Sequence, residues 1–275
     1  SCTGIISDLR LSASIDVIGA KMKTSIDVIL REYDLALLEK NYDRISILVE
    51  GSKKLNRICS RINKLTNGSI LKAISSKEFE KKSCGDVLTL SFPGGIHAKY
   101  LDLVKWSNLG KPNDARKAGV NLAKNSNNSK VLVCCDVQKY SKELITGYLL
   151  RRYEFSQYKT IENKGLGSLT LMLKNPKDFE KPLSEIKAIV DGVFLTRNLV
   201  NEPANILNTR EFSNRLQELS KLGLEVEILE EKKLAKLGMN ALLGVGQGSA
   251  NPSKVVVMSW KGSSKKTKPL ALVGK

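Results

Sequence analysis

Residues 130–137 form the apolar run that most restricts the fold of this chain. Their sequence, KVLVCCDV, places apolar side chains at successive positions, and successive side chains of a strand point to opposite faces of its sheet. A strand of this kind is buried on both faces. Because both faces of a sheet are covered mainly where helices connect parallel strands, the run predicts an α/β fold.

Strand-like and helix-like stretches alternate on both sides of this run. Within one helix-like stretch, Leu55, Ile58, Ile62 and Leu65 recur at helical spacing. Such alternation predicts a mostly parallel sheet with helices on both faces. The expected strands are residues 25–30, 42–51, 86–92, 100–109 and 168–175, and the expected helices are residues 53–65, 114–126 and 141–155.

A domain boundary is expected near residues 176–183, which carry two prolines and several charged residues. Proline-containing polar stretches are typical of linkers. We therefore expect a first α/β domain at residues 22–178, with a mostly parallel sheet. Residues 179–275 are expected to form the incomplete beginning of a second α/β domain.

The second domain shows its own sequence of elements. Asn208 is expected to cap a helix at its amino end, and Gly223 to end that helix. Glycines between residues 241 and 249 suggest a turn. The expected helices are residues 184–202, 209–222 and 231–238, and the expected strands, the last two buried, are residues 224–230, 254–260 and 269–275.

The first 21 residues fit this organisation poorly. The chain begins without Met, whereas Met22 opens the stretch MKTSIDVIL, which looks like a native start. We therefore expect residues 1–21 to be a non-native or disordered extension. A short native extension is the alternative.

The composition is that of a basic protein with a sizeable core. Lys and Arg number 45 against 28 Asp and Glu, which gives a net charge of +17, and hydrophobic residues make up 41%. This charge raises the hypothesis of nucleic-acid binding, although the lysines are scattered and aromatics are only 5%. No run is long and apolar enough to predict a membrane span. Five cysteines without C-x-x-C spacing favour free thiols in the cytoplasm over a disulfide or zinc role.

Few residues suggest chemistry by themselves. His97 is the only histidine, and a lone histidine is more often a surface or packing residue than a base or ligand. The G-V-G-Q-G stretch at residues 244–248 favours a tight turn over a nucleotide loop, and residues 201–205, NEPAN, favour a rigid brace. There is no H-E-x-x-H motif and no carboxylate pair at metal spacing.

Three ordered blocks nevertheless resemble the leucyl aminopeptidase family, also called cytosol aminopeptidases or M17 metallopeptidases. They are LVNEPANILNTREF (199–212), LGMNALLGVGQGS (237–249) and PLALVGK (269–275). The stretch GYLLRRYEFSQYKT (147–160) resembles the segment before that family's catalytic domain. The resemblance is strong from Gly147 onward and weaker between Met22 and that point. It implies a variable, macro-like α/β domain followed by the start of a catalytic domain.

The resemblance implies two-metal hydrolysis of the amino-terminal residue of a peptide, with a leucine-type preference. Two divalent ions, zinc or manganese, would activate a bridging water. The family's L-V-G-K motif carries its first metal-binding lysine, and the match gives that role to Lys275. A lysine binds a metal only when it is neutral, so burial and the ion must lower its pKa. The resemblance also implies a homo-hexamer in the cytoplasm.

The family's other ligands and its N-T-D-A-E-G-R signature match nothing in these 275 residues. Because one potential ligand cannot hold two metals, we expect this chain to be inactive by itself, to bind no metal and to expose apolar edges of its second sheet. Two alternatives stay open at this point. The chain could be a basic DNA-binding module, or an assembly module without catalysis.

Overall fold

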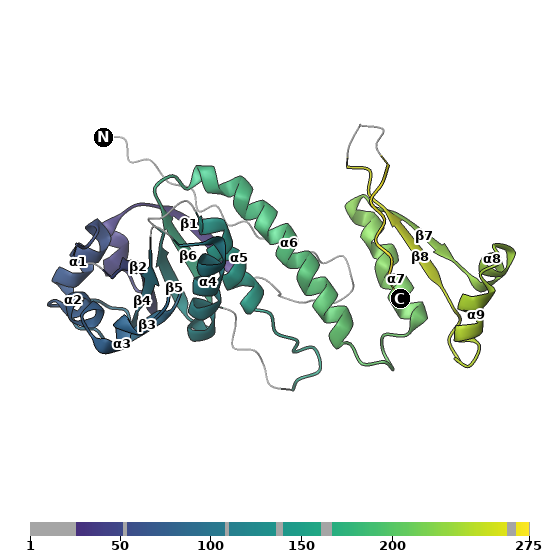
Figure 1. Ribbon diagram of the computed structural model, residues 1–275, viewed down its shortest axis with the longest axis horizontal. Helices are drawn as coiled ribbons and strands as arrows, with labels where there is room; N and C mark the ends of the chain where they lie inside the picture. Colours follow the sequence, from purple (N-terminus) through teal and green to yellow (C-terminus); the bar gives the residue numbers. More distant parts are fainter. Residues whose placement is uncertain are drawn as a thin grey trace. The chain divides into compact units, whose positions relative to one another are not determined.

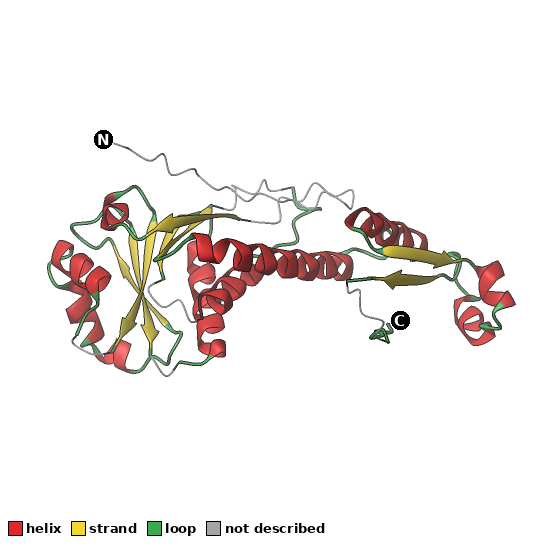
Figure 2. Ribbon diagram, turned by 90° about the horizontal axis from the view of Figure 1, so that it is seen from above, coloured by secondary structure: helices red, strands yellow, loops and turns green. Residues whose placement is uncertain are grey.

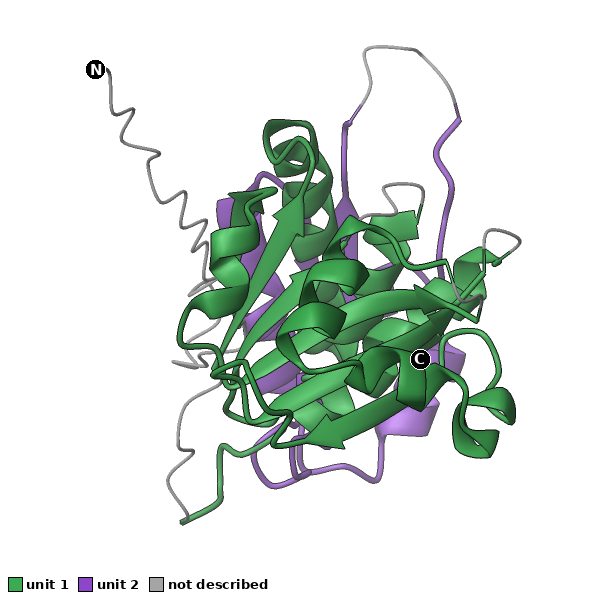
Figure 3. Ribbon diagram, turned by 90° about the vertical axis from the view of Figure 1, so that its left-hand side faces the viewer, with its two compact units in different colours: residues 1–14, 22–197 green, residues 15–21, 198–275 purple. Residues whose placement is uncertain are grey.

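The computed structural model describes residues 26–51, 54–107, 110–135, 140–160, 167–262 and 268–274. The predicted extension at residues 1–21 and the predicted metal ligand Lys275 lie outside the described residues. The described part divides into two compact units, one ending at Arg197 and the other beginning at Asn198 (Figure 3). Each unit is described by itself.

The first unit is built on a six-stranded sheet in the order β1-β6-β5-β2-β4-β3 (Figure 1). All neighbouring strands are parallel except β3, which runs antiparallel to β4. The α/β fold with a mostly parallel sheet is therefore confirmed. The strands are β1 (Asp27–Glu32), β2 (Arg44–Glu50), β3 (Val87–Ser91), β4 (Tyr100–Trp106), β5 (Lys130–Cys134) and β6 (Ser168–Leu173).

Helices cover both faces of this sheet (Figures 1 and 2). One apolar cluster joins the sheet to α4, α5 and α6, and the second joins it to a 3-10 helix, α1, α2 and α3. Along β5, Val131 and Val133 belong to the first cluster, and Leu132 and Cys134 to the second. The predicted burial of this strand on both faces is thus confirmed. The helices are Leu35–Glu39 (3-10), α1 (Arg57–Leu65), α2 (Ser69–Ile74), α3 (Lys77–Glu80), α4 (Pro112–Ser126), α5 (Ser141–Arg151) and α6 (Lys177–Asn201).

The stretch expected to be a linker is helical. It forms the first turns of α6, a helix of 25 residues with Pro182 inside it. Proline removes one backbone donor from the helix, but α6 buries a row of apolar side chains against the first cluster. These are Phe179, Leu183, Ile186, Val190 and Phe194. Tertiary packing therefore outweighs the local effect of the proline.

The second unit contains a two-stranded antiparallel sheet of β7 and β8. Its elements are α7 (Thr209–Gln217), a 3-10 helix (Glu218–Leu222), β7 (Glu225–Leu229), α8 (Glu231–Lys236), α9 (Asn240–Gly246) and β8 (Val255–Ser259). The helix end at Gly223 is confirmed by its left-handed backbone, with φ of 95°, which glycine adopts without strain.

Three expectations for the second unit are wrong. The glycine-rich stretch forms helix α9 rather than only a turn. Strand β8 is not buried, since Val257 and Met258 are 44% and 45% exposed. Residues 268–274 form no strand. A strand needs a neighbour for its backbone hydrogen bonds, and the described residues give these seven no ladder partner.

Candidate functional site

The residues before Lys275 are the part of the predicted metal site that can be described. Leu270, Leu272 and Val273 are 87%, 90% and 98% exposed. Because residues 268–274 form no strand, these exposed side chains are not a sheet edge, and the expected exposure of apolar edges stays a prediction. Lys275 itself lies outside the described residues, so its role as a ligand stays a prediction.

The described residues do not form a metal centre. Within the ranges that the structure describes, no group of three or more His, Cys, Asp or Glu side chains could hold an ion. His97 is exposed on the connection between β3 and β4, as expected of a surface residue. The implied pair of metals therefore does not fit the described side chains.

The Asn-Glu-Pro segment is a scaffold. The Glu202 side chain is 1% exposed, and its Oε1 accepts a hydrogen bond of 2.9 Å from Nη1 of Arg215 in α7. The same guanidinium donates from Nε to Glu211 at 2.8 Å. Burying a carboxylate is costly unless it is paired, and this pairing joins Glu202 to α7 within the second unit. The interpretation of residues 201–205 as a brace rather than a ligand set agrees with these contacts.

The amino end of α7 is capped as the sequence predicts. Oδ1 of Asn208 accepts hydrogen bonds from the backbone N–H groups of Arg210 and Glu211, at 3.0 and 3.1 Å. Thr209 donates its hydroxyl hydrogen to the carbonyl oxygen of Pro252 at 2.8 Å. The start of α7 is thereby joined to the segment that leads into β8.

The glycines at residues 244–248 serve packing. A Cβ atom at Gly246 would collide with the Ser253 side chain, whereas Gly244 and Gly248 have open space around them. The backbone N–H of Ser253 donates to Oε1 of Glu231 at 2.9 Å. Only one of the three glycines is thus required by a close approach, and it faces protein atoms rather than a ligand site.

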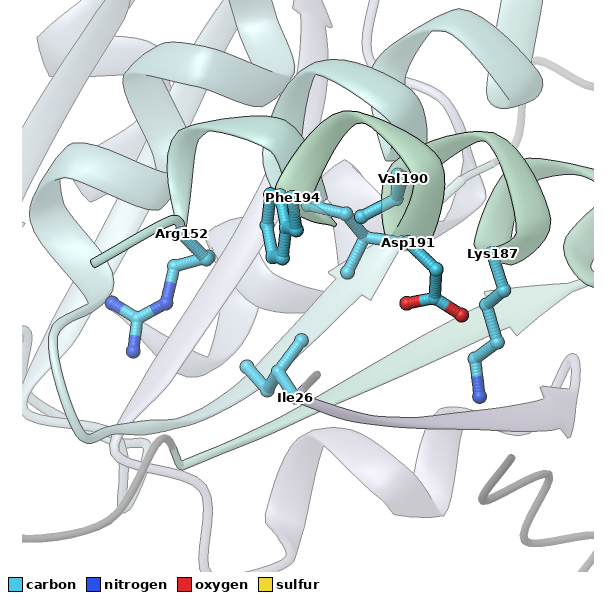
Figure 4. Close-up of a pocket in the computed structure, with 7 residues that line it drawn as sticks. Ile26, Arg152, Lys187, Val190, Asp191 and Phe194 are labelled. Atoms are coloured by element: carbon cyan, nitrogen blue, oxygen red, sulfur yellow. The ribbon is translucent and has the colours of Figure 1, made fainter. Parts of the chain in front are cut away.

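A small pocket in the first unit gathers charged groups that the sequence analysis did not single out (Figure 4). Its volume is about 10 Å³, enough for one water molecule. Lys187 and Asp191 lie on α6 with i, i+4 spacing, a pattern that could have revealed the pair. Burial lowers the pKa of Lys187, against the opposing effects of Asp27 and Asp191. Burial also raises the pKa of Asp191, against the effect of Lys187. A peptide does not fit in this space.

Comparison with known proteins identifies the family of the chain. Residues 194–275 match the family model described as the cytosol aminopeptidase family, catalytic domain. The probable cytosol aminopeptidase of Dinoroseobacter shibae is 42% identical over 242 residues, which are 88% of this chain and 49% of that protein. The chain belongs to the cytosol aminopeptidase family. The corresponding protein of Cereibacter sphaeroides is 41% identical over 88% of this chain and 50% of its own length. The chain thus spans about half the length of these relatives.

Solved structures of low sequence identity show the same fold. A tomato leucine aminopeptidase variant superposes with a TM-score of 0.74 at 22% identity, over 90% of this chain and 54% of its own. The bottromycin maturation enzyme BotP in complex with Mn superposes with a TM-score of 0.57 at 18% identity, over 78% and 44% of the two chains. None of the helices in the described ranges is long and apolar enough to cross a membrane.

Proposed function

We propose that this chain is part of a metal-dependent aminopeptidase that releases the amino-terminal residue, preferentially leucine, from peptides. The observation that carries the proposal is the match of residues 194–275 to the catalytic-domain model of the family. Relatives that are 41–42% identical and are named probable cytosol aminopeptidases support it. The same names support a cytoplasmic location.

We further propose that Lys275 is one ligand of a pair of divalent ions, zinc or manganese. The Mn complex of BotP, which shares the fold, supports the choice of metal. Bound ions would supply an activated water for hydrolysis. Because the described side chains form no metal centre, the remaining ligands must come from other residues. The 275-residue chain is therefore expected to be inactive by itself and to bind no metal.

A chimera provides the test. Residues 22–275 would replace the matching half of the Dinoroseobacter shibae relative, to which this chain is 42% identical over 242 residues. With manganese or zinc, the chimera should release leucine from leucyl amide, and a chelator should abolish the release. The 275-residue chain, assayed in parallel, should release none.

The role of Lys275 is tested in the same chimera. Lys275→Ala should lower kcat/KM by about 100-fold or more, since even residues that only support metal ligands are worth about 10–100-fold. Lys268→Ala is the matched control, because this nearby lysine is exposed, and it should leave kcat/KM unchanged. Full activity of the Lys275→Ala chimera would show that Lys275 is not a ligand.

A homo-hexamer is proposed from the family resemblance, and light scattering on the active chimera would measure it. A mass of one or two subunits would contradict this part of the proposal. Nucleic-acid binding is not proposed, because only the net charge of +17 supports it.

A further inference from the structure

The sheet of the first unit ends in two edge strands of different character. β1 and β3 are the outermost strands, so each has a neighbour on one side only. β1 carries charged side chains at Asp27, Arg31 and Glu32, and charges on an edge strand discourage pairing with another chain. β3 has the sequence VLTLS and carries no charge in residues 87–91. The edge at β3 therefore lacks the protection that β1 has.

Two hydrogen bonds beyond the ends of β3 show which of its residues bond to β4. The backbone N–H of Phe92 donates to the carbonyl oxygen of Lys99 at 2.7 Å, and the carbonyl oxygen of Asp86 accepts from the N–H of Lys105 at 2.8 Å. In an antiparallel pair, residues that exchange hydrogen bonds with the neighbouring strand alternate with residues that do not. The pattern between these two bonds is therefore fixed.

Three residues of β3 direct their backbone groups away from β4. By this alternation Leu88 and Leu90 bond to β4, whereas the N–H and C=O groups of Val87, Thr89 and Ser91 point to the outer side of the sheet. In the described part of the chain, no strand pairs with β3 on that side. Such a row of unpaired donors and acceptors is a template for another strand.

The same edge of a second copy is complementary to this row. When two β3 strands run antiparallel about a two-fold axis at Thr89, Thr89 faces its own copy and Val87 faces Ser91. All three residues then exchange hydrogen bonds with the other copy. Leu88 faces Leu90 in the same arrangement, and cross-strand pairs of this kind and Thr–Thr pairs stabilise sheets. The contact is self-complementary, as a two-fold interface requires.

The chain limits the length of this edge at both ends. Gly85 has a left-handed backbone, with φ of 84°, and its N–H already donates to the carbonyl oxygen of Lys105. Pro93, the next residue in the outward series, has no N–H to donate. Phe92 lies within the paired length and is 75% exposed, so a second copy would cover apolar surface there.

We propose that β3 forms the contact of a symmetrical dimer, in which the first units of two copies share one continuous sheet. The contact is short, and small interfaces are weak, so half of the chains should be paired at about 10–100 µM. Both copies carry a net charge of +17, so salt should strengthen the dimer by screening their repulsion. The contact uses only the first unit and is independent of the proposed peptidase activity.

The 275-residue chain is suited to the test. Sedimentation velocity over about 1–500 µM should show the mass rise from one copy to two, with a midpoint several-fold lower in about 0.5 M salt than in 0.1 M salt. Amide hydrogen exchange, resolved by NMR, locates the contact. The N–H groups of Val87, Thr89 and Ser91, the edge amides, should exchange several-fold more slowly at the highest concentration. Those of Leu88 and Leu90 should be protected equally at all concentrations.

A variant at Ser91 separates this contact from any other. Ser91→Pro removes one edge amide without removing a bond to β4, because proline is tolerated where the N–H faces outward, and it should weaken the dimer at least tenfold. Ser91→Ala is the matched control, since it keeps the N–H, and it should leave the dimer unchanged. Circular dichroism checks that both variants fold. If Ser91→Pro does not fold, the exchange of the edge amides in the unaltered chain decides.

Four results would overturn the proposal. They are a single copy at every concentration, a dimer without slowed exchange of the edge amides, equal weakening by both Ser91 variants, and slowing that requires a foreign peptide. For the last, an extended peptide rich in threonine and valine is added at the lowest concentration. Slowing with this peptide, but not with more of the chain, would show that the edge binds peptides instead of a second copy.

Discussion

Asp102 on β4 is a buried carboxylate that three side chains of the first unit hold by hydrogen bonds. It is 0% exposed and accepts hydrogen bonds from Nη1 of Arg44 at 2.6 Å, Oγ1 of Thr89 at 2.6 Å and Oγ of Ser46 at 3.2 Å. Ser46 and Thr89 are its direct partners across β2 and β3. A slip of one residue would move these side chains to opposite faces. The carboxylate therefore specifies the register of three strands.

Asp102→Ala should destabilise the chain by about 3–5 kcal/mol, because it leaves the Arg44 guanidinium buried without its counter-ion. The midpoint of unfolding in urea measures this loss of stability. Glu39→Ala is the control. It breaks an ion pair with Arg61 whose side chains are 56% and 41% exposed, and such a pair contributes at most about 1 kcal/mol. Similar losses in both variants would contradict the role given to Asp102.

The buried hydroxyl of Tyr148 leads us to expect a loss of folding stability at alkaline pH. Burial raises the pKa of its hydroxyl above the ordinary 10.0, although a hydrogen bond with Ser126 acts in the other direction. Its hydroxyl donates to Oγ of Ser126 at 2.9 Å. Because the folded-state pKa is the higher one, its contribution to stability is full below pH 10.0 and is lost as the pH rises through the folded-state value.

Tyr148→Phe should therefore cost about 1 kcal/mol near neutral pH, the usual value of one hydrogen bond. Between about pH 9 and pH 11, the unfolding midpoint of the unaltered chain should fall more than that of the variant. Parallel curves over this interval would show that burial does not shift the Tyr148 pKa.

Among the elements, the closest packing is between α4 and α5. A Cβ atom at Gly119 would collide with the carbonyl oxygen of Leu144, and one at Gly147 with that of Arg116. Glycine inside a helix normally costs about 0.5–1 kcal/mol relative to alanine. Only a hydrogen atom in place of a side chain at these two positions lets the helix backbones approach so closely. The close packing of the two helices offsets the cost of the glycines.

Gly119→Ala should thus destabilise the chain by about 1–3 kcal/mol, as overpacked cores do. Gly192→Ala in α6 is the matched control. A Cβ atom at Gly192 meets nothing within 4 Å, so this variant should gain about 0.4–1 kcal/mol. The thermal unfolding midpoints of the two variants measure these changes in stability. A higher midpoint in both variants would contradict the close contact at Gly119.

The elements also show what the sequence could predict. The run at β5 was identified correctly, because burial on both faces requires apolar residues at successive positions, and the Asn208 cap was identified from local chemistry. The helix α9 was missed, because its glycines disfavour a helix locally. The small pocket beside Lys187 and Asp191 also escaped prediction, because its walls come from residues far apart in the chain. The predicted role of Lys275 as a metal ligand comes from the family resemblance, because no local sequence pattern indicates it.

At the scale of the whole molecule, the domain boundary predicted at Asp178 stays a prediction that experiment can test. The sequence placed the boundary after Asp178, in the first turn of α6, and the compact unit continues to Arg197. All five apolar side chains that α6 buries lie after Asp178. Since each fully buried side chain of this size contributes about 1.5–3 kcal/mol, their sum is comparable to the 5–15 kcal/mol that stabilises a typical domain.

Two shortened chains test this boundary. Residues 22–197 should unfold in urea in one cooperative transition. Residues 22–178 should show no such transition and should bind a hydrophobic dye, because removing the rest of α6 exposes the first apolar cluster. The longer chain carrying Phe194→Ala and Val190→Ala is the intermediate case, and it should lose about 4–8 kcal/mol if both side chains pack as described. A cooperative transition of residues 22–178 with the midpoint of the longer chain would instead place the domain end at Asp178 and make α6 a separate element.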